Sequence, residues 1–137
     1  GTFDLHDETC INELQAGSYA LMDTHYAKLG LPFAQSCFVL GTVISTSKDW
    51  LVVDVGLKSL GMDHGNPTVD GFEVLFCSDE HTTLVPSKES ASTKVSVGDK
   101  LRVVPAHIDP TMAMHELAYL VRGDEIIDSW SIDLRGW

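Results

Sequence analysis

The feature that most constrains this chain is a series of short runs rich in β-branched and aromatic residues, separated by turn formers. Such runs are typical of β-strands, and a Gly-Asp pair between the last two is a compact hairpin signal. The predicted strands cover residues 18–23, 36–45, 50–55, 71–77, 82–85, 100–105, 117–121 and 125–130. Regular spacing with Gly and Pro turns predicts an all-β fold, an antiparallel β-barrel or a barrel-like sandwich.

Helical signal is confined to two short stretches. Pro110 suits the start of a helix, so residues 111–116 are predicted to form a single helical turn. Residues 23–31 are expected to curl briefly, and little other helix is expected. With 137 residues, 44% of them hydrophobic, the chain is long enough for one domain with its own core.

Charge and cysteine content limit which partners and which cellular compartment we expect for the chain. A net charge of −11, from 20 acidic and 9 basic residues, argues against nucleic acid and anionic membranes as partners. No apolar run reaches the ~18 residues of a membrane span, and residues 1–8 do not resemble a signal peptide. The widely spaced Cys10, Cys37 and Cys77 form no CxxC pair, and their odd number fits a reducing, cytoplasmic setting.

The pair His107 and Asp109 is the first candidate for chemistry. Residues two apart on extended backbone point to the same side, so this imidazole and this carboxylate converge. That donor pair suits a borderline divalent cation such as zinc or manganese. The alternative is a surface histidine that simply pairs with a neighbouring carboxylate.

Other candidate residues each allow a functional and a structural interpretation. Asp63 and His64 lie in a loop dense in turn formers, where they line a site or cap a turn. His115 either orients a ligating side chain without binding the metal itself or is a core histidine. Tyr26 either enters a pocket or packs at a strand end. Lys58 is a Schiff-base nucleophile in principle, but most lysines are solvated.

Four blocks together resemble the C-terminal domain of D-threonine aldolases and eukaryotic-type D-serine dehydratases. They occur in that family's order and span nearly the whole chain. The blocks are ELQAGSY (13–19) with MDxxY (22–26), DVGLKSL (54–60) with DHG (63–65), VGDKLRVVP (97–105) with HxDPT (107–111) and His115, and LVRG (120–123) with IDxW (127–130).

The resemblance implies a fold-type III, alanine-racemase-like pyridoxal-phosphate enzyme. In that family an N-terminal (β/α)8 barrel carries the cofactor lysine, and the C-terminal domain supplies two metal ligands. These are a His and, two residues on, a Cys in the dehydratases or an Asp in the D-threonine aldolases. Here they fall on His107 and Asp109. The implied reaction is the metal-assisted cleavage of a D-3-hydroxy amino acid into glycine and an aldehyde, with manganese or zinc holding the substrate's β-hydroxyl.

The resemblance also implies a division of the protein. A (β/α)8 barrel needs ~250 residues, so this chain is expected to be the C-terminal part of a longer enzyme. Residues 1–12 are then the tail of the barrel or a linker, and residues 13–137 the metal-binding β-barrel domain. Gly1 and Thr2 are interpreted as remnants of a phosphate-binding loop. No catalytic residue is assigned to this chain, and Lys58 lies in the β-domain, so it is not the cofactor lysine.

These expectations name the partners of the chain, and alternative functions stay open. The expected partners are the substrate, the protein's own barrel and, in the full-length enzyme, a second copy as a homodimer. Alone, the chain is expected to be inactive. The alternatives are a D-serine dehydratase-like or racemase-like domain, or a non-enzymatic β-barrel that serves as a binding module.

Overall fold

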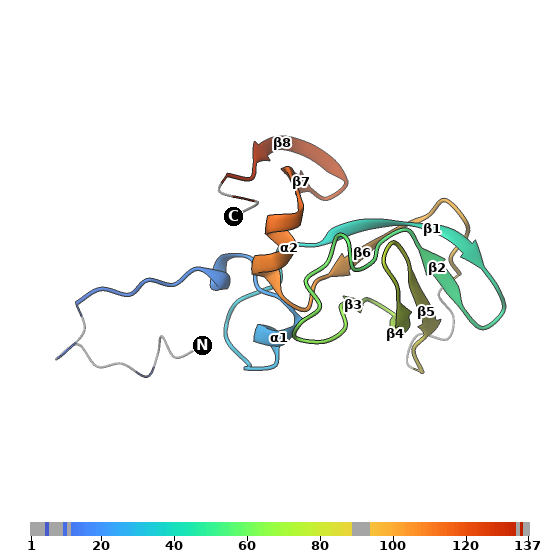
Figure 1. Ribbon diagram of the computed structural model, residues 1–137, viewed down its shortest axis with the longest axis horizontal. Coiled ribbons are helices and arrows are strands. Elements are labelled where there is room, and N and C mark those ends of the chain that lie inside the picture. Colours follow the sequence, from blue (N-terminus) through green and yellow to red (C-terminus); the bar gives the residue numbers. More distant parts are fainter. Residues whose placement is uncertain (1–4, 6–9, 11, 89–93, 134, 136–137) are drawn as a thin grey trace.

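Six short strands close into an antiparallel barrel, as the computed structural model shows (Figure 1). The structure describes residues 5, 10, 12–88, 94–133 and 135. Around the barrel the strand order is β1-β2-β5-β4-β3-β6. The strands are β1 (Val39–Thr46), β2 (Leu51–Val53), β3 (Thr68–Val69), β4 (Phe72–Cys77), β5 (Thr82–Pro86) and β6 (Lys100–Val104). The all-β barrel predicted from the strand pattern is confirmed.

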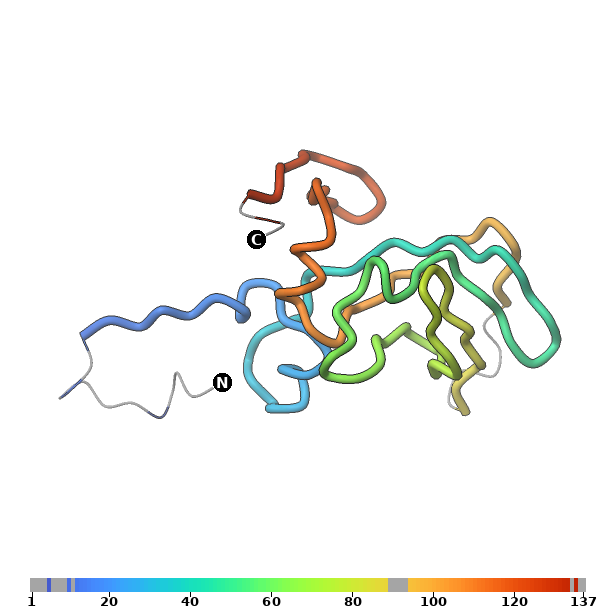
Figure 2. Tube along the Cα trace, viewed as in Figure 1, coloured from blue at the N-terminus to red at the C-terminus, as the bar shows by residue number. Residues whose placement is uncertain are grey.

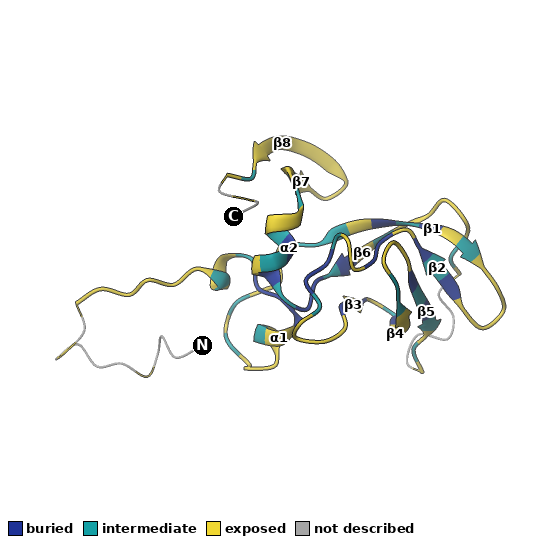
Figure 3. Cartoon of the chain, in the orientation of Figure 1, coloured by how far each residue is buried: buried dark blue, intermediate teal, exposed yellow. Residues whose placement is uncertain are grey.

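Alternation along the strands builds the core. Val43 on β1 pairs with Val53 on β2, and both side chains are fully buried together with Leu84 on β5 and Val103 on β6. Figure 3 shows this buried band running through the barrel strands. Register shifts interrupt the β1–β2 and β4–β5 ladders. Such bulges increase local twist, which helps a sheet of short strands to curl shut.

Helix is sparse, as predicted, but one predicted strand is wrong. Residues 18–23 form no strand: Ser18–Ala20 is a 3-10 turn and Asp23 caps α1 (Thr24–Ala27). The reason is local: the amides of Leu21 and Met22 both donate to the Ser18 carbonyl and close a turn, and the Asp23 carboxylate then accepts the Tyr26 amide at 2.7 Å and starts a helix. The brief curl expected within residues 23–31 is confirmed by α1.

The remaining elements lie at one end of the barrel. Helix α2 (Ile108–Met114) begins three residues earlier than the predicted turn, and the hairpin of β7 (Leu117–Arg122) and β8 (Glu125–Ser131) follows it as predicted. The two-residue strand β3 was not predicted. Figure 3 shows the hairpin largely exposed, standing away from the barrel. Within the described residues, no helix is long and apolar enough to cross a membrane.

The segment before the barrel folds back onto the chain that follows β6. Figure 2 shows residues 12–17 as an extended arm that leads in toward the body of the molecule, where the chain turns into α1. The Thr24 amide then donates to the carbonyl of Pro105 at 3.0 Å. This contact brings α1 beside the start of α2, where the candidate residues gather. Gly1 and Thr2 lie outside the described residues.

Candidate functional site

His107 occupies the junction between β6 and α2, where its backbone is still extended. Two hydrogen bonds tie this junction to the loop that follows Leu60, and a third lies within the junction. The His107 amide donates to the Gly61 carbonyl at 3.2 Å, and the Gly61 amide donates to Thr111 Oγ1 at 2.8 Å. The Thr111 hydroxyl in turn donates to the His107 carbonyl at 2.7 Å. The loop and the helix start are thus held as one unit.

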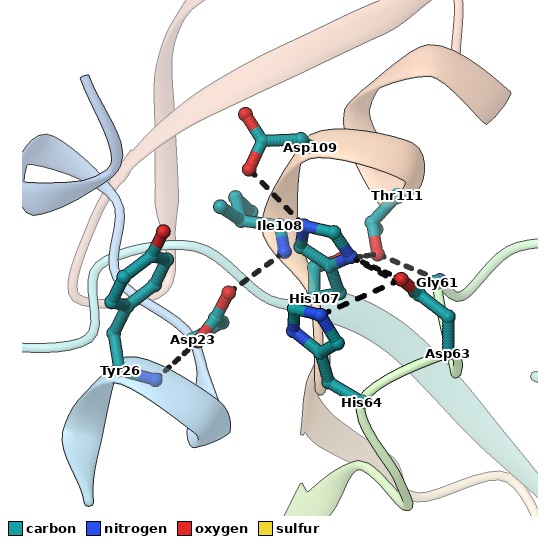
Figure 4. A network of polar contacts seen from close by, with 9 residues as sticks. All are labelled: Asp23, Tyr26, Gly61, Asp63, His64, His107, Ile108, Asp109 and Thr111. Atoms are coloured by element: carbon teal, nitrogen blue, oxygen red, sulfur yellow. Dashed lines mark hydrogen bonds and ion pairs between the residues drawn. The ribbon is translucent and has the colours of Figure 1, made fainter.

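Carboxylates flank the His107 ring at both nitrogens (Figure 4). Nδ1 lies 2.7 Å from Asp63 Oδ2 and 2.9 Å from Asp63 Oδ1. Nε2 lies 3.4 Å from Asp109 Oδ2, so the two side chains converge as predicted, although Asp109 lies in the first turn of α2 and not on extended backbone. The hydrogen bond from His107 lowers the pKa of Asp63. Both carboxylates are exposed, which leaves the site open to a ligand.

Two further imidazoles stack beside His107. The ring of His64 lies nearly parallel to that of His107, with centroids 4.0 Å apart and an interplanar angle of 10°. The ring of His25 from α1 contacts that of His64, with centroids 4.3 Å apart and an interplanar angle of 42°. The donor atoms of Asp63, His64 and His107 all lie within 4.8 Å of one another, which gives a second arrangement that could hold a cation.

Donor separations favour the arrangement that includes Asp109. Two donors that each lie ~2.1 Å from one ion stand ~3.0 Å apart at a right angle and ~3.4 Å apart at a tetrahedral angle. The 3.4 Å between His107 Nε2 and Asp109 Oδ2 matches the tetrahedral value. The 2.7 Å between His107 Nδ1 and Asp63 is a charge-assisted hydrogen-bond length. The cation-sized gap is therefore on the Asp109 side of the ring.

The Asp23 carboxylate anchors the backbone between His107 and Asp109. This carboxylate is fully buried, and its Oδ2 accepts the amide of Ile108 at 3.0 Å. Figure 4 shows Asp23 between Tyr26 and Ile108. Sequence reasoning singled out the segment 23–26 but assigned a role only to Tyr26, and none to Asp23 or His25. An Asp directly before a short polar helix start was the available signal for the cap, but not for its contact with Ile108.

The other predicted residues lie apart from the gap between His107 and Asp109. His115 is half-buried, and its Nε2 donates to the Ser59 carbonyl at 2.9 Å, as a structural histidine does. The Tyr26 ring contacts His25 at 5.9 Å, so it borders the imidazole stack. The structure thus brings together Asp63, His64, His107 and Asp109.

Lys58 is separate from this cluster and pairs with Glu80. Its Nζ donates to Glu80 Oε1 at 2.6 Å on the surface. This hydrogen bond raises the pKa of Lys58, which favours the protonated, non-nucleophilic amine. The structural interpretation of Lys58 as a solvated lysine therefore fits its surroundings.

Comparison with known proteins identifies the family. A sequence profile of the putative serine dehydratase domain matches residues 36–121, which include the barrel, His107 and Asp109. The chain belongs to this family. The resemblance on which the sequence interpretation rests is thereby confirmed.

Relatives within the serine dehydratase domain family include aldolases. The chain is 38% identical to a 3-hydroxy-D-aspartate aldolase from Paracoccus denitrificans (strain Pd 1222), over 91% of this chain and 35% of that protein. It is also 38% identical to a D-threonine aldolase from an Arthrobacter species, with the same coverage. A crystal structure of D-threonine aldolase from Filomicrobium marinum superposes with a TM-score of 0.80 at 38% identity, over 90% of this chain and 36% of that one. The chain thus spans about a third of these relatives' length.

Proposed function

We propose that this chain is the metal-binding domain of a pyridoxal-phosphate- and divalent-metal-dependent lyase that cleaves D-3-hydroxy amino acids, as a D-threonine aldolase does. The observation that carries the proposal is the 3.4 Å gap between His107 Nε2 and Asp109 Oδ2. The aldolase relatives support the reaction class. Because the chain spans about a third of their length, the proposal assigns the remaining functions to a preceding barrel. In that division residues 1–12 are the tail of the barrel or a linker, and residues 13–137 are the β-domain.

The chemistry of the donors fits a small divalent cation. Imidazole and carboxylate are ligands that both zinc and manganese accept. With a neutral imidazole and one carboxylate, the pair contributes a charge of −1, so a bound divalent cation keeps a net positive charge. The exposure of Asp109 leaves room for water or substrate at the remaining coordination positions.

Each group of the site has a task in this proposal. When bound, the metal would supply a Lewis acid that holds and polarises the substrate's β-hydroxyl. His107 and Asp109 hold it, and the Asp23–Ile108 hydrogen bond keeps the backbone between them in place. The ring of His64, which stacks on His107 and also contacts His25, covers one face of the His107 ring. Pyridoxal phosphate, the electron acceptor at the α-carbon, and its lysine are assigned to the barrel.

The comparisons favour an aldolase over a dehydratase. The aldolase relatives share 38% identity with this chain, against 25% for the D-threo-3-hydroxyaspartate dehydratase of Delftia sp. (strain HT23). The carboxylate at Asp109 agrees with this preference, because the resemblance places a Cys there in the dehydratases. Product analysis separates the alternatives, since an aldolase releases glycine and a dehydratase releases ammonia.

The experiment is an assay of the full-length enzyme with D-threonine. We expect glycine and acetaldehyde, a rate that rises with Mn²⁺ and a rate that a chelator lowers. His107→Ala and Asp109→Ala should each lower kcat by ~100-fold or more while the cofactor absorbance persists. Asp49→Asn, which makes a comparable charge change in the β1–β2 turn, is the matched control.

Four results would contradict the proposal. Asp109→Ala with full activity and full metal response would remove the ligand role. Ammonia and 2-oxobutyrate in place of glycine would identify a dehydratase, and D-threonine interconverted with its α-epimer would identify a racemase. No turnover of any D-amino acid by the full-length protein would favour the binding-module alternative. The 137-residue chain alone should be inactive.

A further inference from the structure

The His107–Asp63 contact determines which nitrogen of His107 carries its proton. A neutral imidazole has one N–H, on either Nδ1 or Nε2, and an ionised carboxylate only accepts hydrogen bonds. Both Asp63 oxygens lie within 2.9 Å of Nδ1. The proton of a neutral His107 therefore lies on Nδ1, facing Asp63.

The opposite nitrogen is left with its lone pair. Nε2 faces Asp109 Oδ2 across 3.4 Å, so in this tautomer two acceptors confront each other. Two facing acceptors repel, whereas a cation between them satisfies both. With a proton on Nε2 instead, His107 would donate to Asp109 and lose its lone pair as a ligand. The position of one proton thus decides whether the gap is prepared for a metal ion.

We propose that Asp63 is a positioning residue, which holds the proton of His107 on Nδ1 and the ring in place, so that Nε2 and Asp109 face a gap prepared for a cation. The metal-binding part of this inference rests on the proposed function. A carboxylate that accepts the second N–H of a ligating histidine is a general device for orienting the ring. Here that carboxylate comes from a loop 44 positions earlier in the chain.

His64 supports the same ring from its face. The two imidazoles stack at 4.0 Å with an interplanar angle of 10°, which limits rotation of His107 away from Asp63. The rival arrangement places the ion among Asp63, His64 and His107, with the nearest atoms of Asp63 and His64 3.7 Å apart. That ion would compete with the Nδ1 proton for Asp63 and leave Asp109 without a role. The hydrogen-bonded geometry of Asp63 therefore favours its positioning role over direct ligation.

The first experiment reads the tautomer directly and needs no metal. Long-range ¹H–¹⁵N NMR at about pH 9, where an ordinary imidazole is neutral, reports which ring nitrogen is protonated. In the metal-free full-length enzyme, we expect His107 to carry its proton on Nδ1. In Asp63→Ala the proton should move mostly to Nε2, and in the control Asp49→Asn it should stay on Nδ1. A proton on Nε2 in the wild type, or an unchanged tautomer in Asp63→Ala, would overturn the proposal.

The second experiment measures whether the contact between Asp63 and His107 strengthens metal binding. Asp63→Ala should weaken Zn²⁺ binding ~10–100-fold, with most of kcat recovered at saturating metal. Asp63→Asn keeps an acceptor oxygen without the charge and should fall between Ala and wild type. Unchanged Zn²⁺ affinity in Asp63→Ala would contradict the metal-binding part of the proposal while leaving the lyase assignment intact. A wild-type enzyme that needs no metal, with its His107 proton on Nδ1, would instead overturn the proposed function.

Discussion

The buried carboxylate of Asp23 accepts the backbone amide of Ile108 at 3.0 Å, across 85 positions of sequence. Ile108 separates His107 from Asp109, so this single contact anchors the peptide between the two proposed ligands. The other Asp23 oxygen caps α1 through the Tyr26 amide. One side chain therefore connects the segment before the barrel to the geometry of the site.

Removal of the Asp23 carboxylate should destabilise the fold and loosen the site. Asp23→Ala leaves two amides without acceptors, and the Ile108 amide is buried, so we expect a loss of about 2–4 kcal/mol in the free energy of unfolding. Asp23→Asn keeps one acceptor oxygen and should lose less. Urea denaturation followed by circular dichroism measures both variants. Wild-type stability in Asp23→Ala would show that the contact contributes nothing.

Gly61 is predicted to tolerate no side chain. A Cβ there would lie 2.4 Å from Pro110 Cγ and 2.8 Å from the His107 carbonyl, closer than van der Waals contact allows. Gly61→Ala should therefore push α2 away, cost about 1–3 kcal/mol of stability and weaken Zn²⁺ binding. Gly17→Ala is the control, because a Cβ at Gly17 meets nothing within 4 Å. Equal stability and Zn²⁺ affinity of the two variants would contradict the close packing at Gly61.

The barrel could be predicted because most of its strands are recognisable from their own residues, without knowledge of the strands with which they pair. Runs such as residues 50–55 and 100–105 are β-branched and end at turn formers, and both became strands. Residues 18–23 looked similar, but a capping contact from Asp23 outweighed their β-propensity. The strand Thr68–Val69 is too short to leave a pattern, since its pairing with β4 and β6 defines it.

Sequence reasoning could predict the site only where its residues are close together in the sequence. His107 and Asp109 are only two positions apart, so sequence reasoning could pair them, but it assumed extended backbone through Asp109, which lies in the first turn of α2. The contact between Asp63 and His107 joins residues 44 apart, and only the closed barrel brings them together. Sequence reasoning therefore named both residues but not their contact. The His25–His64–His107 stack needs three separate segments and could not be inferred from spacing.

Lys58 is predicted to be dispensable for cofactor binding. Its hydrogen bond to Glu80 raises the pKa of the Lys58 amine, so at neutral pH the amine stays protonated and is a poor nucleophile. Lys58→Ala in the full-length enzyme should retain the absorbance of bound pyridoxal phosphate and the wild-type rate. Loss of that absorbance in Lys58→Ala, with the fold intact by circular dichroism, would overturn this assignment.

Cys37 should react slowly with alkylating reagents. Burial raises the pKa of its thiol, and only the thiolate is nucleophilic. At any given pH below that pKa, Cys37 therefore has less thiolate than an ordinary thiol. The rate of iodoacetamide labelling, followed by peptide mass spectrometry, should rise with pH along a curve displaced to higher pH than that of glutathione. A curve that coincides with glutathione's would contradict the effect of burial.

The claim that His107 and Asp109 share one metal ion is tested most directly by locating a bound ion. Crystals of the full-length enzyme soaked in ZnCl2 and measured at the zinc edge give its position from anomalous scattering. We predict a peak ~2.0–2.2 Å from both His107 Nε2 and Asp109 Oδ2, with Asp63 still hydrogen-bonded to Nδ1. A peak between Asp63 and His64, with none beside Asp109, would contradict the central claim.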